Sequence, residues 1–314
     1  MRNTRFVFLL VLMVFANFYD AAAKSLTIAY PSTTWNTSLP LSMGRQFGMF
    51  AAEGLEVAPV YIRGGPVVIA ALLSGDADYA IMAGVTAVSS INRGADLLVV
   101  GGHTSQIDQV LMGAKGVSKL SDLIGKVIGV TGSGGVTEFA TVEALARNGL
   151  IRDRDYKLMY AGTSPVRIKA LETGVVQAAP FSATERVIME RQGFPAILEI
   201  GRAIPEFPFV VIVTSRQKTK SQPSETVALL RAINSSIRLI QTDKEKVLAA
   251  AAKKDPGADI DVLRRSLDYT VDTYSIALAK RNVAALLYAA KINFPDTDKF
   301  FTDEFLTKAL KAQK

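Results

Sequence analysis

Residues 71–84 read ALLSGDADYAIMAG, and this stretch decides the class of fold. Its first part is an apolar helical segment that stops at Ser74-Gly75, and its second part, residues 78–82, is a short apolar run typical of a buried strand. Gly84 then opens another helical segment. A helix, a tight turn, a buried strand and a second helix in so few residues predict a βα unit in a mainly parallel sheet.

The same alternation extends to both sides of this stretch. The expected strands of a first series are residues 26–30, 56–62, 78–82 and 96–100, and its expected helices are residues 41–53, 67–73 and 84–93. A second series has expected strands at residues 126–130, 156–160 and 175–179, and expected helices at residues 136–148, 165–172 and 182–192. Two series of about 100 residues each predict two α/β domains, which we call lobe 1 and lobe 2.

The last third of the chain has a different pattern, because it is almost wholly helical and has no glycine-rich loops. Its expected helices are residues 223–242, 244–254, 259–268 and 276–290, which we expect to pack on lobe 1. The apolar run 209–213 can carry the chain back to lobe 1, and residues 109–112 are the matching outward crossing. The sequence therefore predicts that residues 24–110 and 212–314 form lobe 1 and that residues 111–211 form lobe 2.

The N-terminus has the pattern of a secretory signal peptide. Arg2 and Arg5 precede an apolar run over residues 6–16, and the small residues Ala21 and Ala23 fit a cleavage site. The alternative is a retained membrane anchor, but the run is shorter than the roughly 20 residues that span a bilayer. We expect residues 1–23 to be removed near Ala23 and the mature chain to be periplasmic.

Composition narrows the chemistry further. The chain has no cysteine, which excludes a lipid-anchored N-terminus, thiol catalysis and thiolate metal sites. The net charge of +7 is basic, but the export signal and the lack of a basic-aromatic motif argue against nucleic acid as a partner. The basic excess favours anionic solutes by field steering, although most of it reads as solvated surface.

Three stretches carry a resemblance to a known family: residues 41–57, LSMGRQFGMFAAEGLEV; residues 71–84; and residues 120–135, LSDLIGKVIGVTGSGG. With these stretches the chain resembles the periplasmic solute-binding proteins of ABC transporters, in the branch related to alkanesulfonate, taurine, nitrate and thiamine-precursor (pyrimidine synthase-like) binders. The resemblance implies a type II fold of two βα lobes joined by two crossing segments. It also implies capture of a small solute, delivery to a membrane permease with its ATPase, and a monomeric carrier.

Ligands of open α/β sheets bind at loops that leave the carboxyl ends of strands, where helix N-termini offer free N–H groups to anions. Four loops fit that description and carry glycines for close backbone approach or hydroxyl donors. The alternative for each residue is an ordinary turn or cap. The candidates from three of these loops are Gly64, Gly65, Gly84, Thr86, Ser133, Gly134, Gly135 and Thr137.

The remaining loop contains Trp35, the one tryptophan, beside Asn36 and Ser38. We expect Trp35 to form a wall for the apolar part of a ligand, because large aromatic side chains supply contact area while polar neighbours orient. An exposed structural tryptophan is the competing interpretation. Together with the anion-binding loops, this wall predicts a small organic acid, a carboxylate or a sulfonate, as the solute.

Lobe 2 contributes candidates that could close on the ligand: Thr163, Ser164, Phe181 and Ser182. Phe181 could equally be a core residue. Arg167 could pair with a ligand anion, but an ordinary surface arginine is the favoured interpretation. His103, the one histidine, is expected to be structural or at the rim of the cleft.

Catalysis is not supported by the motifs. A Ser-His-Asp triad would need His103, yet no G-x-S-x-G elbow is present, and the loop at residues 132–135 lacks the pattern of a nucleotide site. We expect no cofactor and no metal. Two alternatives to transport remain: an exported ligand-sensing module for a receptor, and a pyrimidine-synthase-like enzyme, which the missing cysteine disfavours.

Overall fold

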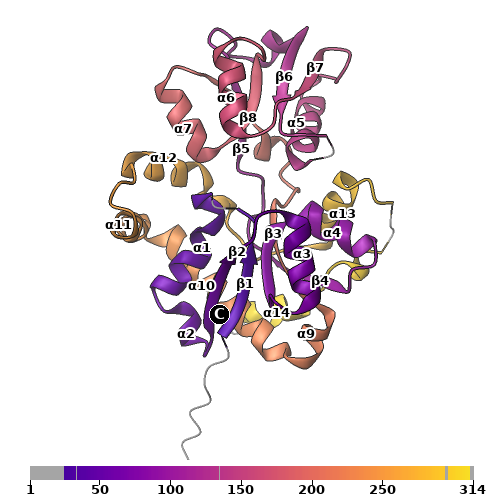
Figure 1. Ribbon diagram of the computed structural model, residues 1–314, viewed down its shortest axis with the longest axis vertical. Helices are drawn as coiled ribbons and strands as arrows, with labels where there is room; N and C mark the ends of the chain where they lie inside the picture. Colours follow the sequence, from indigo (N-terminus) through magenta and orange to yellow (C-terminus); the bar gives the residue numbers. More distant parts are fainter. Residues whose placement is uncertain (1–24, 33, 134, 294–295, 312–314) are drawn as a thin grey trace, which may run out of the picture.

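The computed structural model describes residues 25–32, 34–133, 135–293 and 296–311. The expected signal peptide, residues 1–23, lies outside the described residues. The chain forms two α/β lobes, each built on a five-stranded sheet and joined through a narrow middle (Figure 1). This confirms the predicted two-lobed α/β class.

The sheet of lobe 1 has the strand order β2-β1-β3-β10-β4. β1 is parallel to both β2 and β3, whereas β10 is antiparallel to its neighbours β3 and β4. β3 and β4 are buried along their length, as expected for strands covered on both faces. The bounds are β1 Ser25–Tyr30, β2 Glu56–Tyr61, β3 Tyr79–Ala83, β4 Leu97–Gly102 and β10 Val210–Ser215.

The sheet of lobe 2 repeats this plan with the order β7-β6-β8-β5-β9. Here β5 is the antiparallel strand, between β8 and β9. Each sheet therefore contains one strand that the chain lays down after crossing from the other lobe. The bounds are β5 Gln109–Gly113, β6 Lys126–Val130, β7 Tyr156–Tyr160, β8 Ala178–Ser182 and β9 Ala196–Glu199.

Helices cover both sheets (Figure 1). The helices before the first crossing are α1 Trp35–Gln46, α2 Met49–Ala52, α3 Gly65–Ser74 and α4 Gly84–Asn92. The helices between the crossings are α5 Val136–Arg147, α6 Ser164–Glu172, α7 Ala183–Arg191 and α8 Ile200–Ala203, with the 3-10 turn η1 Leu120–Leu123. The helices after the second crossing are α9 Arg216–Ser221, α10 Pro223–Thr242, α11 Lys244–Lys254, α12 Ile260–Thr270, α13 Lys280–Ala289 and α14 Glu304–Lys311, with 3-10 turns η2 Val271–Thr273 and η3 Thr297–Lys299.

The two crossings lie slightly earlier than the sequence predicts. Residues 103–108 lead from β4 into β5, and residues 204–209 lead from α8 into β10. The predicted crossing runs are themselves paired strands: Val110 faces Phe181 of β8, and Val211 faces Met82 of β3. Their apolar character comes from burial in the sheets. The first crossing, HTSQID, is more polar than the strand that follows it, whereas the second, IPEFPF, is itself mainly apolar.

The first helix differs from the prediction, which started it at residue 41. In the structure α1 begins at Trp35 and contains Pro40, so Trp35 is helical and does not lie in a loop. A proline inside a helix leaves the carbonyl four residues earlier without its donor. That carbonyl, Asn36 O, instead accepts a hydrogen bond of 2.7 Å from the hydroxyl of Tyr274. A distant residue thus stabilises a helix start that local sequence argues against.

The C-terminal helices pack on lobe 1 with one exception. α10 packs against α1, α2 and α14, and α13 packs against α4, as predicted. α12 packs instead mainly on α7 of lobe 2, and Figure 1 shows it between the two lobes. Because α12 also contacts α1 and α11 of lobe 1, it joins the two lobes. In the part of the chain that the structure describes, no helix is long and apolar enough to cross a bilayer.

Candidate ligand-binding site

A cavity of about 280 Å³ lies between the two lobes beside the crossings. It receives side chains from lobe 1, from both crossings and from lobe 2, so it is the interlobe cleft that the fold predicts. Its apolar lining is Pro31, Ile81, Met82, Ala83, Phe209 and Val210. Its polar lining is Ser32, Thr34, Thr37, Asp108, Gln109, Thr131, Thr137, Ser164, Arg167, Ser182 and Glu185.

Arg167 supplies the positive charge of this cavity. It lies in the first turns of α6 and is only 4 % exposed, which corrects the expectation of a surface arginine. Its guanidinium donates to the carbonyls of Gly162 and Pro180, at 2.6 and 3.2 Å, and to Ser164 Oγ at 3.1 Å. The guanidinium carbon also lies 5.2 Å from the centre of the Phe181 ring. The guanidinium is thus held in place by neutral acceptors, two carbonyls and one hydroxyl.

No described carboxylate neutralises the charge of the Arg167 guanidinium. No described carboxylate forms an ion pair with Arg167, and its Nε is buried without a hydrogen-bond partner among the described residues. Burial lowers the pKa of Arg167, and the nearby charge of Glu185 partly opposes this. A buried cation without a paired anion is costly. An acidic group of a bound ligand would supply the missing partner.

Glu185 lines the cavity from the first turn of α7. Its Oε2 accepts hydrogen bonds from the backbone N–H of Ser182 at 2.8 Å and from its hydroxyl at 2.9 Å. Ser182 Oγ accepts in turn from the Glu185 N–H, which completes a capping box. The capping box pairs the N–H groups of Ser182 and Glu185, and the negative charge of Glu185 makes the N-terminus of α7 less favourable for a ligand anion.

Asp108 and Gln109 line the cavity where the first crossing enters β5. Burial raises the pKa of the Asp108 carboxyl to about 6, and the charge of Glu185 acts in the same direction. The side-chain oxygen of Gln109 is buried without a hydrogen-bond partner among the described residues. Acceptor groups from the first crossing and the start of β5 therefore line the same cavity as Arg167.

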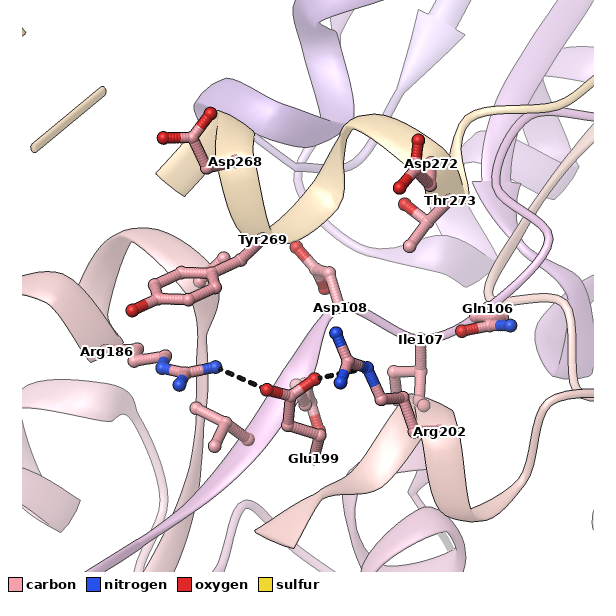
Figure 2. Close-up of a pocket in the computed structure, with 14 residues that line it drawn as sticks. Gln106, Ile107, Asp108, Arg186, Glu199, Arg202, Asp268, Tyr269, Asp272 and Thr273 are labelled. Atoms are coloured by element: carbon pink, nitrogen blue, oxygen red, sulfur yellow. Dashed lines mark hydrogen bonds and ion pairs between the residues drawn. The ribbon is translucent and has the colours of Figure 1, made fainter. Parts of the chain in front are cut away.

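A second cavity of about 260 Å³ lies on the other side of the same crossing and shares Asp108 and Gln109 (Figure 2). Its charged groups largely pair with one another. Figure 2 shows Glu199 between Arg186 and Arg202, at 3.0 and 2.8 Å. Arg186 also pairs with Glu190 at 2.8 Å. This cavity has no buried cation that lacks an anion, and we read it as part of the joint between the lobes.

The joint consists of α7 and α12, together with their contacts, and we call it the interlobe clasp. The Arg186 guanidinium lies 3.7 Å from the centre of the Tyr269 ring, Arg265 pairs with Glu190 at 2.9 Å, and Thr184 and Ser266 share a hydroxyl hydrogen bond of 2.9 Å. Each of these contacts connects lobe 2 with a C-terminal helix. The clasp thus connects the two lobes on one side of the cleft through contacts between protein side chains.

Three of the residues predicted from sequence line the interlobe cavity, and the others do not. Thr137, Ser164 and Ser182 are among its lining residues. Gly134 lies outside the described residues. The predicted residues that the structure places away from this lining are Trp35, Asn36, Ser38, Gly64, Gly65, Gly84, Thr86, Ser133, Gly135, Thr163 and Phe181.

The glycines of lobe 1 have packing reasons. A Cβ on Gly84 would lie 2.7 Å from Leu286 Cδ1, and a Cβ on Gly65 would lie 2.8 Å from Thr86 Cγ2. A side chain at either position would force Leu286 or Thr86 to move, so both glycines have a packing role, which sequence cannot distinguish from backbone approach to a ligand. Gly64 has φ of 98°, a conformation that favours glycine on its own.

Trp35, which we expected to form an aromatic wall of the binding site, does not line the cavity. Trp35 is half-buried and packs against the core of lobe 1, while its neighbours Thr34 and Thr37 line the cavity. Asn36 is buried, and its amide donates to Ser266 Oγ at 3.0 Å. Phe181 is wholly buried in lobe 2, beneath Arg167. Trp35 and Phe181 therefore belong to the packing around the cavity and not to its lining.

His103 is fully buried where β4 leads into the first crossing. Neither ring nitrogen has a hydrogen-bond partner among the described residues, and burial lowers the pKa of the imidazole to about 4. The ring meets that of Tyr274 edge-on, with centres 6.3 Å apart. His103 is thus a neutral core residue of the hinge, in line with the predicted structural role.

Several lining residues were missed by sequence reasoning. Glu185 could have been found, because Ser182 and Glu185 have the S-x-x-E spacing of a capping box next to a predicted helix start. Asp108 and Gln109 belong to no sequence motif that would have marked them as site residues. Their position depends on where the chain crosses between lobes, which only the sheet pairing defines.

The comparisons with known proteins agree with this architecture. The family model described as NMT1/THI5 like matches residues 35–246. No curated protein sequence matches the chain. Among solved structures, a putative periplasmic sulfonate-binding protein SsuA from Methylobacillus flagellatus is similar with a TM-score of 0.73 at 19 % identity, covering 93 % of this chain and 95 % of that one.

Two further structures are similar. The periplasmic aliphatic sulphonate-binding protein SsuA from Escherichia coli has a TM-score of 0.72 at 19 % identity and covers 85 % of each chain. The alkanesulfonate-binding protein SsuA from Xanthomonas axonopodis, bound to MOPS, has a TM-score of 0.67 at 19 % identity and covers 85 % of this chain and 93 % of that one. The periplasmic binding protein fold predicted from the sequence is confirmed, and the chain belongs to the NMT1/THI5-like family.

Proposed function

We propose that the protein is an exported solute-binding protein, not an enzyme, that encloses a small molecule with an acidic group between its lobes and delivers it to the permease of an ABC transporter. One observation carries this proposal. Arg167 is a buried cation in a cavity between two lobes, and the described residues give it no anion. Such a site needs a ligand for electrostatic balance, and no bond needs to break for it to do so.

The transport role is supported by what the similar structures are. Three of them are named as sulfonate-binding proteins, two of these as periplasmic. A periplasmic location of this chain would follow from cleavage near Ala23, and the intact mass of the secreted protein tests it. A mature species that retains residues 1–23 would contradict export.

The helix N-termini that best fit the predicted binding of an anion are those of α6 and α5. Ser164 and Arg167 stand in the first turns of α6, and Thr137 stands in the first turn of α5 and is 7 % exposed. Helix N-termini attract anions through their free N–H groups and the helix dipole. We propose that the acidic group of the solute lies among these three side chains.

Native mass spectrometry of protein purified without refolding tests capture directly. A retained small molecule of acidic character that disappears on unfolding and refolding is the expected result. If the native protein carries no small molecule and a panel of carboxylates and sulfonates produces no thermal shift, the proposed function is wrong.

A further inference from the structure

The interlobe cavity presents charges of both signs on two different helices. Arg167 of α6 and Glu185 of α7 line the same cavity, yet they form no ion pair with each other. They influence one another only through space. If they were in contact, each would neutralise the other, and the cavity would have no electrical preference. Held apart, they leave room for a ligand that pairs with both.

The acidic side of the cavity is more than a helix cap. Both capping hydrogen bonds of Glu185 use Oε2, and the structure gives Oε1 no hydrogen bond from a described residue. Two further acceptors line the same cavity: Asp108 and the side-chain oxygen of Gln109, which is buried without a partner among the described residues. A buried acceptor without a donor costs about 1–3 kcal/mol, so the Gln109 oxygen favours a ligand that donates. Asp108 already interacts with the side chain of Asn36 and contributes as an acidic group.

A purely anionic solute would satisfy only half of this cavity. Its acidic group would gain Arg167 but would lie among Glu185 and Asp108, and like charges brought together in a low-dielectric site repel. A purely cationic solute would meet the converse problem at Arg167. The cavity of about 280 Å³ is at the small end for ligand sites, so both groups of the solute must lie close together.

We infer that the solute is a small zwitterion, with its acidic group on Arg167 and an ammonium or similar N–H-donating cation facing Glu185, Asp108 and Gln109. This inference rests on the proposed function and specifies the second group of its ligand. Glu185 acts as the selecting residue, because it lines the cavity and both of its capping hydrogen bonds at the start of α7 use Oε2 alone.

Calorimetric titration with three probes of matched size tests the inference: taurine as the zwitterion, ethanesulfonate as the anion alone and ethanolamine as the cation alone. Taurine is expected to bind at least about tenfold more tightly than either single-charge probe. Ethanesulfonate binding as tightly as taurine would overturn the inference and leave the proposed function standing. Binding of none of the three would also overturn it, and the wider panel of acids would then decide the proposed function separately.

The substitution Glu185→Gln separates selection from folding. Glutamine can still cap α7, so the fold should survive, whereas the charge is lost. Taurine should then bind about tenfold more weakly, with ethanesulfonate unchanged or tighter. Glu138→Gln is the control, because Glu138 stands in the first turn of α5 but pairs with Arg152 and Tyr160 outside the cavity. Equal losses of taurine and ethanesulfonate in Glu185→Gln would contradict a selecting role.

Discussion

The hydroxyl of Tyr274 donates a hydrogen bond of 2.7 Å to the backbone carbonyl of Asn36, the acceptor that Pro40 leaves without its helical donor. Both residues are buried. The bond connects the segment after α12 with the first helix of lobe 1. It lets α1 begin at Trp35 and so fixes Thr34 and Thr37 at the cavity.

Tyr274→Phe should lower the free energy of unfolding by about 1–3 kcal/mol, because it leaves the buried Asn36 carbonyl unsatisfied. Urea denaturation measures the effect. Adding Pro40→Ala supplies the missing N–H and should recover part of the loss. Tyr156→Phe is the matched control, because the hydroxyl of Tyr156 is buried without a hydrogen-bond partner among the described residues. A loss in the control as large as in Tyr274→Phe would rule out this account of α1.

The fully buried His103 should make stability depend on pH. Its folded pKa of about 4 lies below the ordinary 6.5, so the unfolded chain binds the proton first. The free energy of unfolding contributed by this group is therefore complete above pH 6.5 and falls as the pH falls towards 4. Asp108, with its raised pKa, acts in the opposite sense between about pH 4 and 6.

His103→Phe isolates the histidine contribution, because Asp108 is present in both proteins and cancels in the difference. Chemical denaturation at several pH values should show the variant gaining stability relative to the parent as the pH falls from 6.5 to 4. A difference that does not change with pH would show that the imidazole is not held neutral in the hinge.

The interlobe clasp should bias the protein towards closure. Arg186→Ala removes the guanidinium that packs on Tyr269, a cation–π contact worth about 0.5–2 kcal/mol. The variant should have a larger radius of gyration without ligand and bind its solute a few-fold more weakly, as scattering and calorimetry would show. Arg202→Ala is the control, since Arg202 shares the partner Glu199 but is largely exposed. An unchanged radius of gyration in Arg186→Ala would argue that the clasp does not set the closed state.

Most of the fold could be predicted because the strands and helices are locally consistent. The helices α10 and α11 have the predicted bounds, and β6 and β7 do as well. The misses have non-local causes. α1 depends on Tyr274, 234 residues after Pro40 in the printed numbering, and β9 and α8 are short elements placed by the lobe 2 sheet.

The site could be predicted only in outline. The rule that ligands bind at the carboxyl ends of strands led to Thr137, Ser164 and Ser182, which line the candidate cavity. It could not separate glycines needed for packing, such as Gly84 against Leu286, from glycines that approach a ligand. The burial of Arg167 also could not be predicted, because the guanidinium is held by the carbonyl of Gly162, before α6, and by the carbonyl of Pro180 in β8.

Titration of the protein and its Arg167→Gln variant with the acidic solute released from the native protein tests the central claim most directly. Arg154→Gln is the control, an exposed arginine of lobe 2 whose ion pair is with Asp155. We predict that Arg167→Gln binds about ten- to a hundredfold more weakly, since it removes the one cation among the described residues that line the cavity, and that Arg154→Gln binds like the parent. If Arg167→Gln binds as tightly as the parent, the solute does not pair with Arg167 and the proposed site is wrong.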